Sequence, residues 1–553
     1  MNTRGGSSRA ARGLLAGADI ESLPQNQMHL IPIRNVSLFL SAVALAACSN
    51  GSSSRVDSRP IDSSQSTVNV VNEVLAASDG VSGVRFRVAL RAADGSAIAG
   101  RPVTIRATGD GNAYWPAATV PSDAQGIADL RVSSTVSGRK RVSFEVGTGA
   151  DATPLPNEPE IEFVATTVPR RRVSESSSGA EGNDFSRQAA VSADGRYVAF
   201  QSKADNLVPG DSNEKEDVFV HDRTSGTTER VSLLPSGGQF NDLCGDPSLS
   251  DDGFQVAFEG RQSDTDAVWV RDRILATTEP ISGAAGLDGR CFAPAISGNG
   301  RWVAFLRDDG ESQLVYAWDR VGAQLLLISR NDAGQPADGA CYAPSISRDG
   351  RWITFASIAS NLVGDDSNDK IDVFVHDRLA ATTRRVSVRS DGAEGNDDSV
   401  EPAIAADGRW VAFASKAENL VAGDDNGKSD VFVHDLQTGT TTRHSVDPQG
   451  NEVDKESWLP VLSADGTWLV FSSLSDDLAP GDTNGKEDVF CRDLVAGTTR
   501  RVSQALGGGD PDEFCTAPAL AADAPVVAFT AKAGNMVPSD ENDTDDAFVA
   551  PRN

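Results

Sequence analysis

An acidic loop recurs five times between residues 211 and 546, each time just ahead of an apolar segment that reads as a strand. The spacing is D-x-N-x-x-x-D, as in "DDNGKSD" at 424–430. Oxygen ligands at alternate positions, followed by a further carboxylate, are the donors that a hard cation such as Ca²⁺ requires. The candidate cation-binding residues are Asp211, Asn213, Asp217, Asp366, Asn368, Asp372, Asp424, Asn426, Asp430, Asp482, Asn484, Asp488, Asp540, Asn542 and Asp546.

A structural interpretation of the same loop competes with the calcium interpretation. The loop is shorter than the D-x-N-x-D-G-x-x-D calcium loops of integrin-type propellers, and it lacks a bidentate Glu. Asp and Asn side chains also accept hydrogen bonds from nearby backbone N–H groups in Asx turns. Both interpretations stay open here, and no cofactor other than Ca²⁺ is predicted.

A His-Asp dipeptide is the second pattern with chemical potential. His221, His376 and His434 each precede an Asp at one repeated position. A catalytic group is needed once, whereas a structural group recurs in every repeat, so we interpret the Asp as a turn cap after a strand. The sequence also lacks a G-x-S-x-G nucleophile elbow. We therefore predict no catalytic residues and expect that the chain is not an enzyme.

The N-terminal segment predicts export and a lipid anchor. The apolar stretch "VSLFLSAVALAA" at 36–47 is too short to span a bilayer and ends in small residues before Cys48. The string "LAAC" resembles the lipobox of bacterial lipoproteins, which implies cleavage before Cys48 and lipidation of its sulfur. Residues 1–48 are thus the signal, with Met28 as an alternative start, and the Ser-rich run at 49–66 is a flexible linker. Ser49 after the modified Cys implies the outer membrane, facing either the periplasm or the cell surface.

Composition narrows the range of partners. The formal net charge is −29, and an acidic surface repels a phosphate backbone, so nucleic acid is excluded as a natural partner. Cations or basic partners fit better. Six cysteines without a CxxC pair predict neither a zinc site nor a full disulfide framework.

Residues 67–168 alternate apolar and polar side chains between turns rich in Gly and Asp, which predicts a β-sandwich. The pattern "ADGSAIAGRPVTI" followed by "DAQGIADLRVSS" resembles the bacterial Ig-like domains of the invasin and intimin type. That resemblance implies a stalk or spacer.

Residues 170–553 are governed by a repeat. The motif P-x-I-S-x-D-G-R-W-V-A-F has seven copies. Each full copy contains four strand candidates, of which the first two belong to the motif itself. Four strands in a period of about fifty residues indicate the blades of a β-propeller. The last copy lacks its fourth strand, and "RRVS" at 171–174 matches that strand of an internal copy at 384–387. We therefore predict an all-β chain: an Ig-like sandwich, then a seven-bladed propeller closed by its own N-terminal strand.

The repeated "S-x-D-G-R-x-V-A-F" string resembles the TolB-type propeller family, which also includes accessory domains of prolyl-oligopeptidase-like enzymes. The resemblance implies the fold and leaves the function open.

The predicted function is binding. Tight "DG" and "TGTT" turns on one face are not expected to form a pocket, so the face with long acidic loops should bind a protein, peptide or envelope polymer. Two repeats, with "EGRQSDTDAVWV" and "LRDDGESQLVYAW", have shortened loops, which predicts a notch in the rim. The membrane is a partner through the lipid anchor only. The alternative is a polysaccharide lyase or glycosidase acting at the mouth of the central channel.

Overall fold

The computed structural model describes two parts of the chain, residues 66–164 and residues 171–552. Within them, no description is given for residues 71–74, 78–82, 109–111, 116–117, 124, 135–137, 148–151, 157–158, 263–264 and 539. The regular elements of the described residues are all β-strands apart from one short helix, α1 (Ile281–Ala284). The prediction of an all-β chain is therefore confirmed. None of the described helices is long and apolar enough to cross a membrane.

The first part is a β-sandwich. One sheet has the order β1 (Thr67–Val70), β3 (Gly83–Ala89), β7 (Ile127–Ser134) and β5 (Asn112–Trp115). The other sheet has the order β2 (Leu75–Ala77), β10 (Glu160–Val164), β8 (Gly138–Val146), β4 (Pro102–Ala107) and β6 (Thr119–Pro121), with β9 (Thr153–Pro154) paired to β8.

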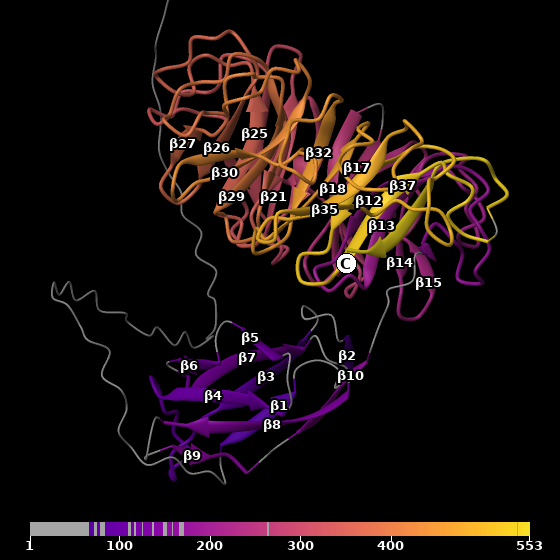
Figure 1. Cartoon of the computed structure of the whole chain (residues 1–553). Helices are drawn as coiled ribbons and strands as arrows, with labels where there is room; N and C mark the ends of the chain where they lie inside the picture. The colour runs from indigo at the N-terminus through magenta and orange to yellow at the C-terminus, as the bar shows by residue number, and fades with distance from the viewer. Residues whose placement is uncertain are drawn as a thin grey trace, which may run out of the picture. The chain divides into compact units, whose positions relative to one another are not determined.

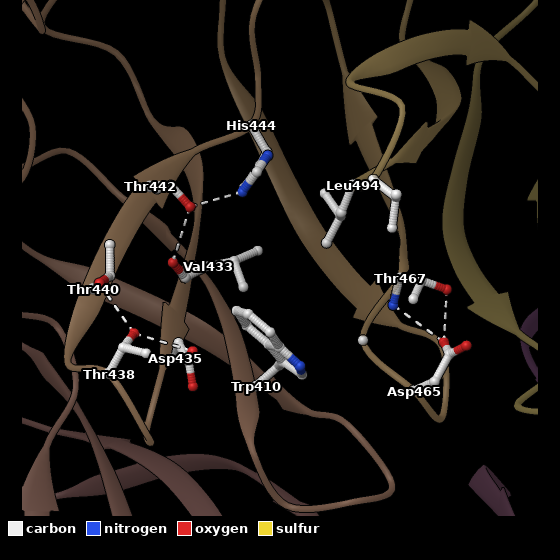
Figure 2. Close-up of a pocket in the computed structure, with 12 residues that line it drawn as sticks. Trp410, Val433, Asp435, Thr438, Thr440, Thr442, His444, Asp465, Thr467 and Leu494 are labelled. Atoms are coloured by element: carbon white, nitrogen blue, oxygen red, sulfur yellow. Dashed lines mark hydrogen bonds between the residues drawn. The ribbon is translucent and has the colours of Figure 1, made fainter. Parts of the chain in front are cut away.

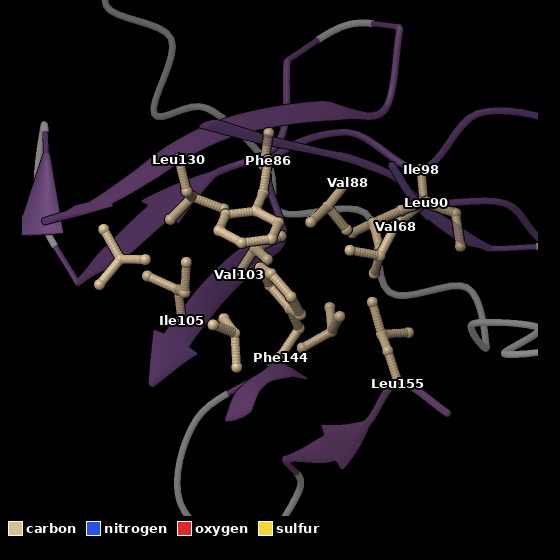
Figure 3. Close-up of a cluster of buried hydrophobic side chains, with 14 of the residues drawn as sticks. Val68, Phe86, Val88, Leu90, Ile98, Val103, Ile105, Leu130, Phe144 and Leu155 are labelled. Carbon is tan, nitrogen blue, oxygen red and sulfur yellow. The ribbon is translucent and has the colours of Figure 1, made fainter. Parts of the chain in front are cut away.

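The alternating pattern of this segment explains its core. In β4, Val103 and Ile105 are buried and Arg106 is exposed, as the period of two along a strand requires. Phe86 from one sheet and Phe144 from the other meet edge to face, with ring centroids 5.3 Å apart (Figure 3). Both side chains are fully buried, so this ring pair joins the two sheets.

The second part is a succession of four-stranded antiparallel sheets, of the β-propeller type (Figure 1). The sheets are β12 (Ser186–Val191), β13 (Tyr197–Ser202), β14 (Asp217–Asp222) and β15 (Thr227–Arg230); β16 (Cys244–Leu249), β17 (Gln255–Gln262), β18 (Thr265–Asp272) and β19 (Thr277–Pro280); β20 (Arg290–Ile296), β21 (Trp302–Asp308), β22 (Gln313–Asp319) and β23 (Gln324–Leu327); β24 (Cys341–Ile346), β25 (Trp352–Ser357), β26 (Asp372–Asp377) and β27 (Thr382–Arg385); β28 (Ser399–Ile404), β29 (Trp410–Ser415), β30 (Asp430–Asp435) and β31 (Thr440–Arg443); β32 (Ser457–Leu462), β33 (Trp468–Ser473), β34 (Asp488–Asp493) and β35 (Thr498–Arg501); and β11 (Arg171–Arg172) with β38 (Asp546–Pro551), β37 (Val526–Ala531) and β36 (Cys515–Leu520).

The two middle strands of each sheet are apolar on both faces because each sheet is packed between two others. In β29 and β30, "WVAFAS" and "DVFVHD" are buried at nearly every position. Phe413 and Phe432 stack across these strands with centroids 5.8 Å apart, and equivalent Phe pairs recur in other sheets. Burial on both sides, rather than alternation, is what a sheet covered on both faces demands.

The Ser-x-Asp-Gly turn joins the innermost strand to the next one and also sets the contact between sheets. The Ser463 hydroxyl donates to Asp465 Oδ1 at 2.7 Å and accepts from the Trp468 N–H at 3.0 Å. Gly466 has φ +66°, and a Cβ built on it would lie 2.1 Å from Cδ1 of Trp410 in the preceding sheet. The Gly is therefore required both for the backbone conformation and for the close approach of the Trp.

The two ends of this part of the chain meet in one sheet. Arg171 pairs with Val549 and Arg172 with Phe548, so β11 is the outer strand beside β38. Figure 1 shows β37 near β12 and β13. Backbone hydrogen bonds near the turns also run from sheet to sheet and from the last sheet back to the first: Ala193 N to Asp251 O, Asp251 N to Gly298 O, Asn299 N to Arg348 O, Arg348 N to Ala406 O, Asp407 N to Ala464 O, Ala464 N to Ala522 O, and Asp523 N to Ala193 O.

Candidate functional site

The acidic loops enclose an arginine that the sequence analysis did not anticipate. In the loop before β30, Arg443 Nη1 lies 3.3 Å from Asp424 Oδ1, 3.6 Å from Asp430 Oδ2 and 2.7 Å from Glu452 Oε1. Arg443 comes from the outer strand β31, and Glu452 from the hairpin that follows it. A guanidinium therefore stands among the three carboxylates, where the calcium interpretation would put its ion.

The Asn of the loop has a structural task. Asn426 Nδ2 donates to Asp430 Oδ2 at 3.0 Å and to the Val453 carbonyl at 2.9 Å, while its Oδ1 accepts from the Lys428 N–H at 2.6 Å. The amide nitrogen, a donor, thus faces Asp430. This is the Asx-turn geometry of the structural interpretation, extended by a bond to the next hairpin.

The same arrangement of residues, which we name the arginine-centred loop unit, recurs in the other four acidic loops. Each unit has the two Asp and one Asn of the motif, an Arg from the outer strand of the same sheet, and an acidic or amide side chain from the following hairpin. The four are Asp211, Asn213, Asp217, Arg230 and Gln239; Asp366, Asn368, Asp372, Arg385 and Glu394; Asp482, Asn484, Asp488, Arg501 and Asp510; and Asp540, Asn542, Asp546, Arg172 and Glu181.

Two sheets without the acidic loop also lack the arginine. The position of Asp430 is Ala267 in β18 and Leu314 in β22 by strand register. The position of Arg443 is Pro280 in β19 and Leu327 in β23. Acid and base are lost together, as expected if each exists to balance the other when buried.

All five units hold more acid than base, and the pKa values reflect this. Burial and the neighbouring Asp430 raise the pKa of Asp424 to about 7, although Arg443 opposes the rise. Burial is the largest cause of the raised pKa in the equivalent carboxyls: about 7 for Asp488 and Asp546, and about 6 for Asp366, Asp482 and Asp540. These groups are unlike ordinary surface carboxylates because one guanidinium must serve two or three of them.

The repeated His-Asp dipeptide is part of the framework. The Thr441 hydroxyl donates to the Val388 carbonyl of the loop after the preceding sheet, so the His434 ring donates through Nδ1 to Thr441 Oγ1 at 2.9 Å. Asp435 accepts the Gln437 N–H at 2.9 Å, which caps the turn, and pairs with Arg409. His221 and His376 bond to Thr228 and Thr383 in the same way.

The turns that follow the innermost strands carry polar residues that do not follow the repeat. Arg348 Nη2 donates to Asp523 Oδ2 at 2.9 Å and its Nε pairs with Asp251, so it joins three sheets near the turns. The same repeat position holds Asp251 in one other sheet and Ala or Gly in the remaining five. Beside it lies a small cavity of about 140 Å³ lined by Leu249, Ile296, Ile346, Ile404 and Leu462. Two carboxylates offset the one guanidinium, so the cluster serves as a cross-link.

A second departure from the repeat is acidic. Asp246 and Glu401 lie on innermost strands at bulges where the backbone has φ +48° and +54°. Glu259 lies beside Asp246, and burial together with that neighbour raises its pKa to about 7. A carboxyl group that titrates near neutrality can exchange protons with a substrate, which is the chemistry of the enzymatic alternative.

A larger cavity, of about 470 Å³, lies between the sheets that begin with β28 and β32, beside the tight turns (Figure 2). Trp410, Thr442, His444 and Asp465 line it, together with Leu494. The expectation that the tight turns form no pocket was therefore wrong. Two adjacent sheets, rather than one turn, make its walls. We name it the seam cavity.

Cys48 and the signal and linker residues before 66 lie outside the described residues. Cys244, Cys291, Cys341, Cys491 and Cys515 are buried free thiols, and burial raises the pKa of each.

Comparisons with known proteins support the first part of the chain by family. Residues 65–157 match the family model of the bacterial Ig-like domain (group 1), which confirms the predicted Ig-like domain. No match to a curated protein is found by sequence.

The chain is also similar to several solved structures. TolB from Acinetobacter baumannii is 15% identical over 70% of this chain and 80% of that one, with a TM-score of 0.37. An oligogalacturonate lyase from Vibrio parahaemolyticus is 11% identical over 82% and 98%, with a TM-score of 0.41. The β-propeller domain of the Trilobed protease from Pyrococcus furiosus is 11% identical over 66% and 95%, with a TM-score of 0.42.

Proposed function

We propose that the chain is an exported, lipid-anchored protein of the cell envelope whose propeller binds a basic protein, peptide or envelope polymer through its face of acidic loops. In this proposal residues 67–168 are an Ig-like spacer, and residues 170–553 are seven blades in one closed ring. The pairing of β11 with β38 and the backbone hydrogen bonds that lead from the last sheet back to the first support the ring.

The observation that carries the binding proposal is the excess of carboxylates in the arginine-centred loop units. Four of the five units hold three acidic side chains around one arginine, so each keeps net negative charge when ionised. The loops also present acidic side chains to solvent, such as Asp365, whose side chain is 78% exposed. Repeated negative charge on one face attracts cationic partners and speeds their association.

The shortened loops of two sheets support a place where a partner segment enters the channel mouth. The sheets that begin with β16 and β20 lack the acidic loops, and β17 leads into β18, and β21 into β22, by short connections. A partner segment can therefore reach the channel mouth at these two sheets more easily than elsewhere along the rim.

The anchor is proposed from Cys48 and the apolar run before it. Cys48→Ala should release the protein from the membrane fraction, and metabolic labelling with a fatty acid should mark the native chain alone. A Cys48→Ala protein that stays in the outer-membrane fraction and a native chain without label would exclude the anchor.

Site-specific photo-crosslinking in the native envelope tests the binding face. A crosslinker at Asp365, in an acidic loop, should capture a partner in a salt-sensitive way. The matched control is Val321, which is also 78% exposed but lies in the turn between β22 and β23. Equal capture from both positions, or capture from Val321 alone, would exclude the loop face as the main binding surface.

The second candidate is a propeller enzyme, a lyase or glycosidase, and the pair Asp246 and Glu259 favours it. The pair occurs once among the sheets, and Glu259 titrates near neutrality. An assay of reducing-end release from acidic polysaccharides, with Glu259→Gln as the control, tests this candidate. No release by the native chain would leave the pair without a catalytic role.

A further inference from the structure

At three of the seams between consecutive sheets, those of Tyr197, Trp302 and Trp468, an aromatic ring is covered by an arginine, whereas Gln255 and Val526 stand at the ring position of two other seams. The ring belongs to the first residue of the second strand in one sheet, and the arginine follows the third strand of the next sheet. Arg378 lies 3.7 Å from the Trp302 ring centroid, Arg273 lies 4.3 Å from Tyr197, and Arg552 lies 4.6 Å from Trp468. The guanidinium also reaches a backbone acceptor, since Arg378 Nε donates to the Gly350 carbonyl at 2.9 Å. The ring and the carbonyl together form an arginine-binding site within the fold.

A second position can supply the guanidinium instead. At the Trp352 seam the residue after the third strand is Leu436, and the outer strand β27 provides Arg384, 5.6 Å from the Trp352 centroid. Each seam has these two positions, one on the outer strand of a sheet and one directly after the third strand of the next sheet. In that order, the residues at the seven seams are Glu229 and Arg273, Glu279 and Arg320, Leu326 and Arg378, Arg384 and Leu436, Thr442 and Leu494, Arg500 and Arg552, and Arg171 and Arg223.

Among these described seams, the one at Trp410 has no arginine at either position. Thr442 stands where Arg384 stands in the neighbouring sheet, and Leu494 stands where Arg378 and Arg552 stand. Arg409 contacts the Trp410 ring at 4.4 Å, but its counterparts Arg301 and Arg351 do the same at their own rings, in addition to the second arginine. The missing guanidinium coincides with the seam cavity of about 470 Å³.

The groups that would receive a guanidinium are still in place. Trp410 lines the cavity, and so do Asp465 and Gly466, whose counterpart Gly350 accepts from Arg378. Hydrogen bonds from Ser463 and Thr467 outweigh burial and lower the pKa of Asp465, so its carboxylate is ionised at neutral pH. Figure 2 shows Trp410 and Asp465 from adjacent sheets, with His444 and Leu494 at the far side of the cavity.

His444 is a third departure from the repeat at this one seam. Its position holds Val or Ile in every other sheet, as in Val386 and Val502. Its Nε2 bonds to Thr442 Oγ1 at 2.8 Å, and burial lowers its pKa to about 3. The ring is therefore neutral and adds a polar, uncharged group to the wall without repelling a cation.

We propose that the seam cavity binds an arginine side chain presented by a partner polypeptide, in place of the arginine that the other seams supply from the chain itself. The other seams show which chemistry the site accepts: a planar cation that stacks on the indole and donates to a carbonyl. The acidic net charge of −29 favours the approach of such a partner. The inference is independent of the loop face, because the seam cavity lies beside the tight turns.

The test uses the full chain labelled with 5-fluorotryptophan and two peptides, acetyl-Gly-Arg-Gly-amide and the same peptide with citrulline. The Trp410 signal is assigned by Trp410→Phe. We expect the arginine peptide to shift this signal and to bind about fivefold or more tightly than the citrulline peptide, which has the same shape without the charge. Equal shifts by both peptides, or none by either, would overturn the proposal.

Leu494→Arg restores within the chain the arginine of the other seams, so it should abolish the shift while leaving the far-UV spectrum unchanged. Thr442→Arg does the same from the other position and replaces the first variant if that one does not fold. Leu436→Arg is the matched control, because Arg384 already serves the Trp352 ring, and it should bind like the native chain. Full binding by a folded Leu494→Arg or Thr442→Arg protein would exclude the seam cavity as the arginine site.

Discussion

Arg172 Nη1 lies 3.6 Å from Asp546 Oδ2, although the two residues stand at opposite ends of the propeller sequence. Arg172 also pairs with Glu181 at 2.7 Å, while the neighbouring Ser174 hydroxyl donates to Asp546 Oδ1 at 2.5 Å. Arg443, Asp430 and Ser445 form the same contacts inside a single sheet. The joint between the two ends is therefore built from one arginine-centred loop unit shared between them.

Arg172→Ala should lower the free energy of unfolding of the propeller by about 3–5 kcal/mol, because it leaves buried carboxylates without their partner. The side chain of Arg172 is 9% exposed, whereas that of Arg171 is 41% exposed. Arg171→Ala is the control and should change the free energy by no more than about 0.5 kcal/mol. Urea unfolding at pH 8, followed by circular dichroism, measures both, and equal losses would show that the unit does not hold the ends together.

Asp424→Asn should stabilise the protein relative to the native chain increasingly as the pH rises from 4 to 8. The pKa of Asp424 is about 7 in the fold and about 3.9 in an unfolded chain, so the folded state holds the extra proton in this range. The stability that this proton contributes is present below pH 4 and is lost as the pH rises through 7. Midpoints of thermal unfolding across this range measure the difference. A difference that stays constant with pH would contradict the raised pKa.

Ca²⁺ should leave the thermal unfolding of the native chain unchanged, because a guanidinium already occupies the centre of each arginine-centred loop unit. Arg443→Met removes that charge and leaves Asp424, Asp430 and Glu452, whose carboxylate oxygens lie within 4.8 Å of one another. Ca²⁺ should then raise the midpoint of the variant, and a chelator should reverse the effect. Arg389→Met, at an exposed ion pair, is the control. A shift of the native chain by Ca²⁺ would restore the calcium interpretation.

His444→Val should stabilise the protein relative to the native chain increasingly as the pH falls from 7 to 4. Burial lowers the pKa of His444 to about 3, so the unfolded state binds a proton in this range and the folded state does not. The contribution of His444 to the free energy of unfolding of the native chain is fully present above about pH 6.5 and declines as the pH falls. Thr442→Val, which removes the hydrogen bond and keeps the imidazole, should retain the native pH dependence. Parallel pH profiles for His444→Val and the native chain would contradict the lowered pKa.

The sequence alone determined the strands and their turns. The Ser-x-Asp-Gly string encodes a turn by local chemistry, since Gly466 supplies the positive φ and Asp465 caps the backbone. The match between 171–174 and 384–387 predicted which strand β11 would become, because equal sequences take equal places in a repeat. The alternating pattern likewise predicted a sandwich, and the resemblance of the segment to bacterial Ig-like domains is confirmed by the family match.

Only the tertiary structure decided what fills the acidic loops and where the seam cavity lies. Arg443 comes from a different strand than Asp424, and no spacing rule joins the two until the hairpin brings them together. The seam cavity depends on Thr442 and Leu494 in different sheets, each an unremarkable substitution alone. Local sequence sets backbone conformation, whereas charge balance and cavities depend on side chains that meet only after the sheets have packed.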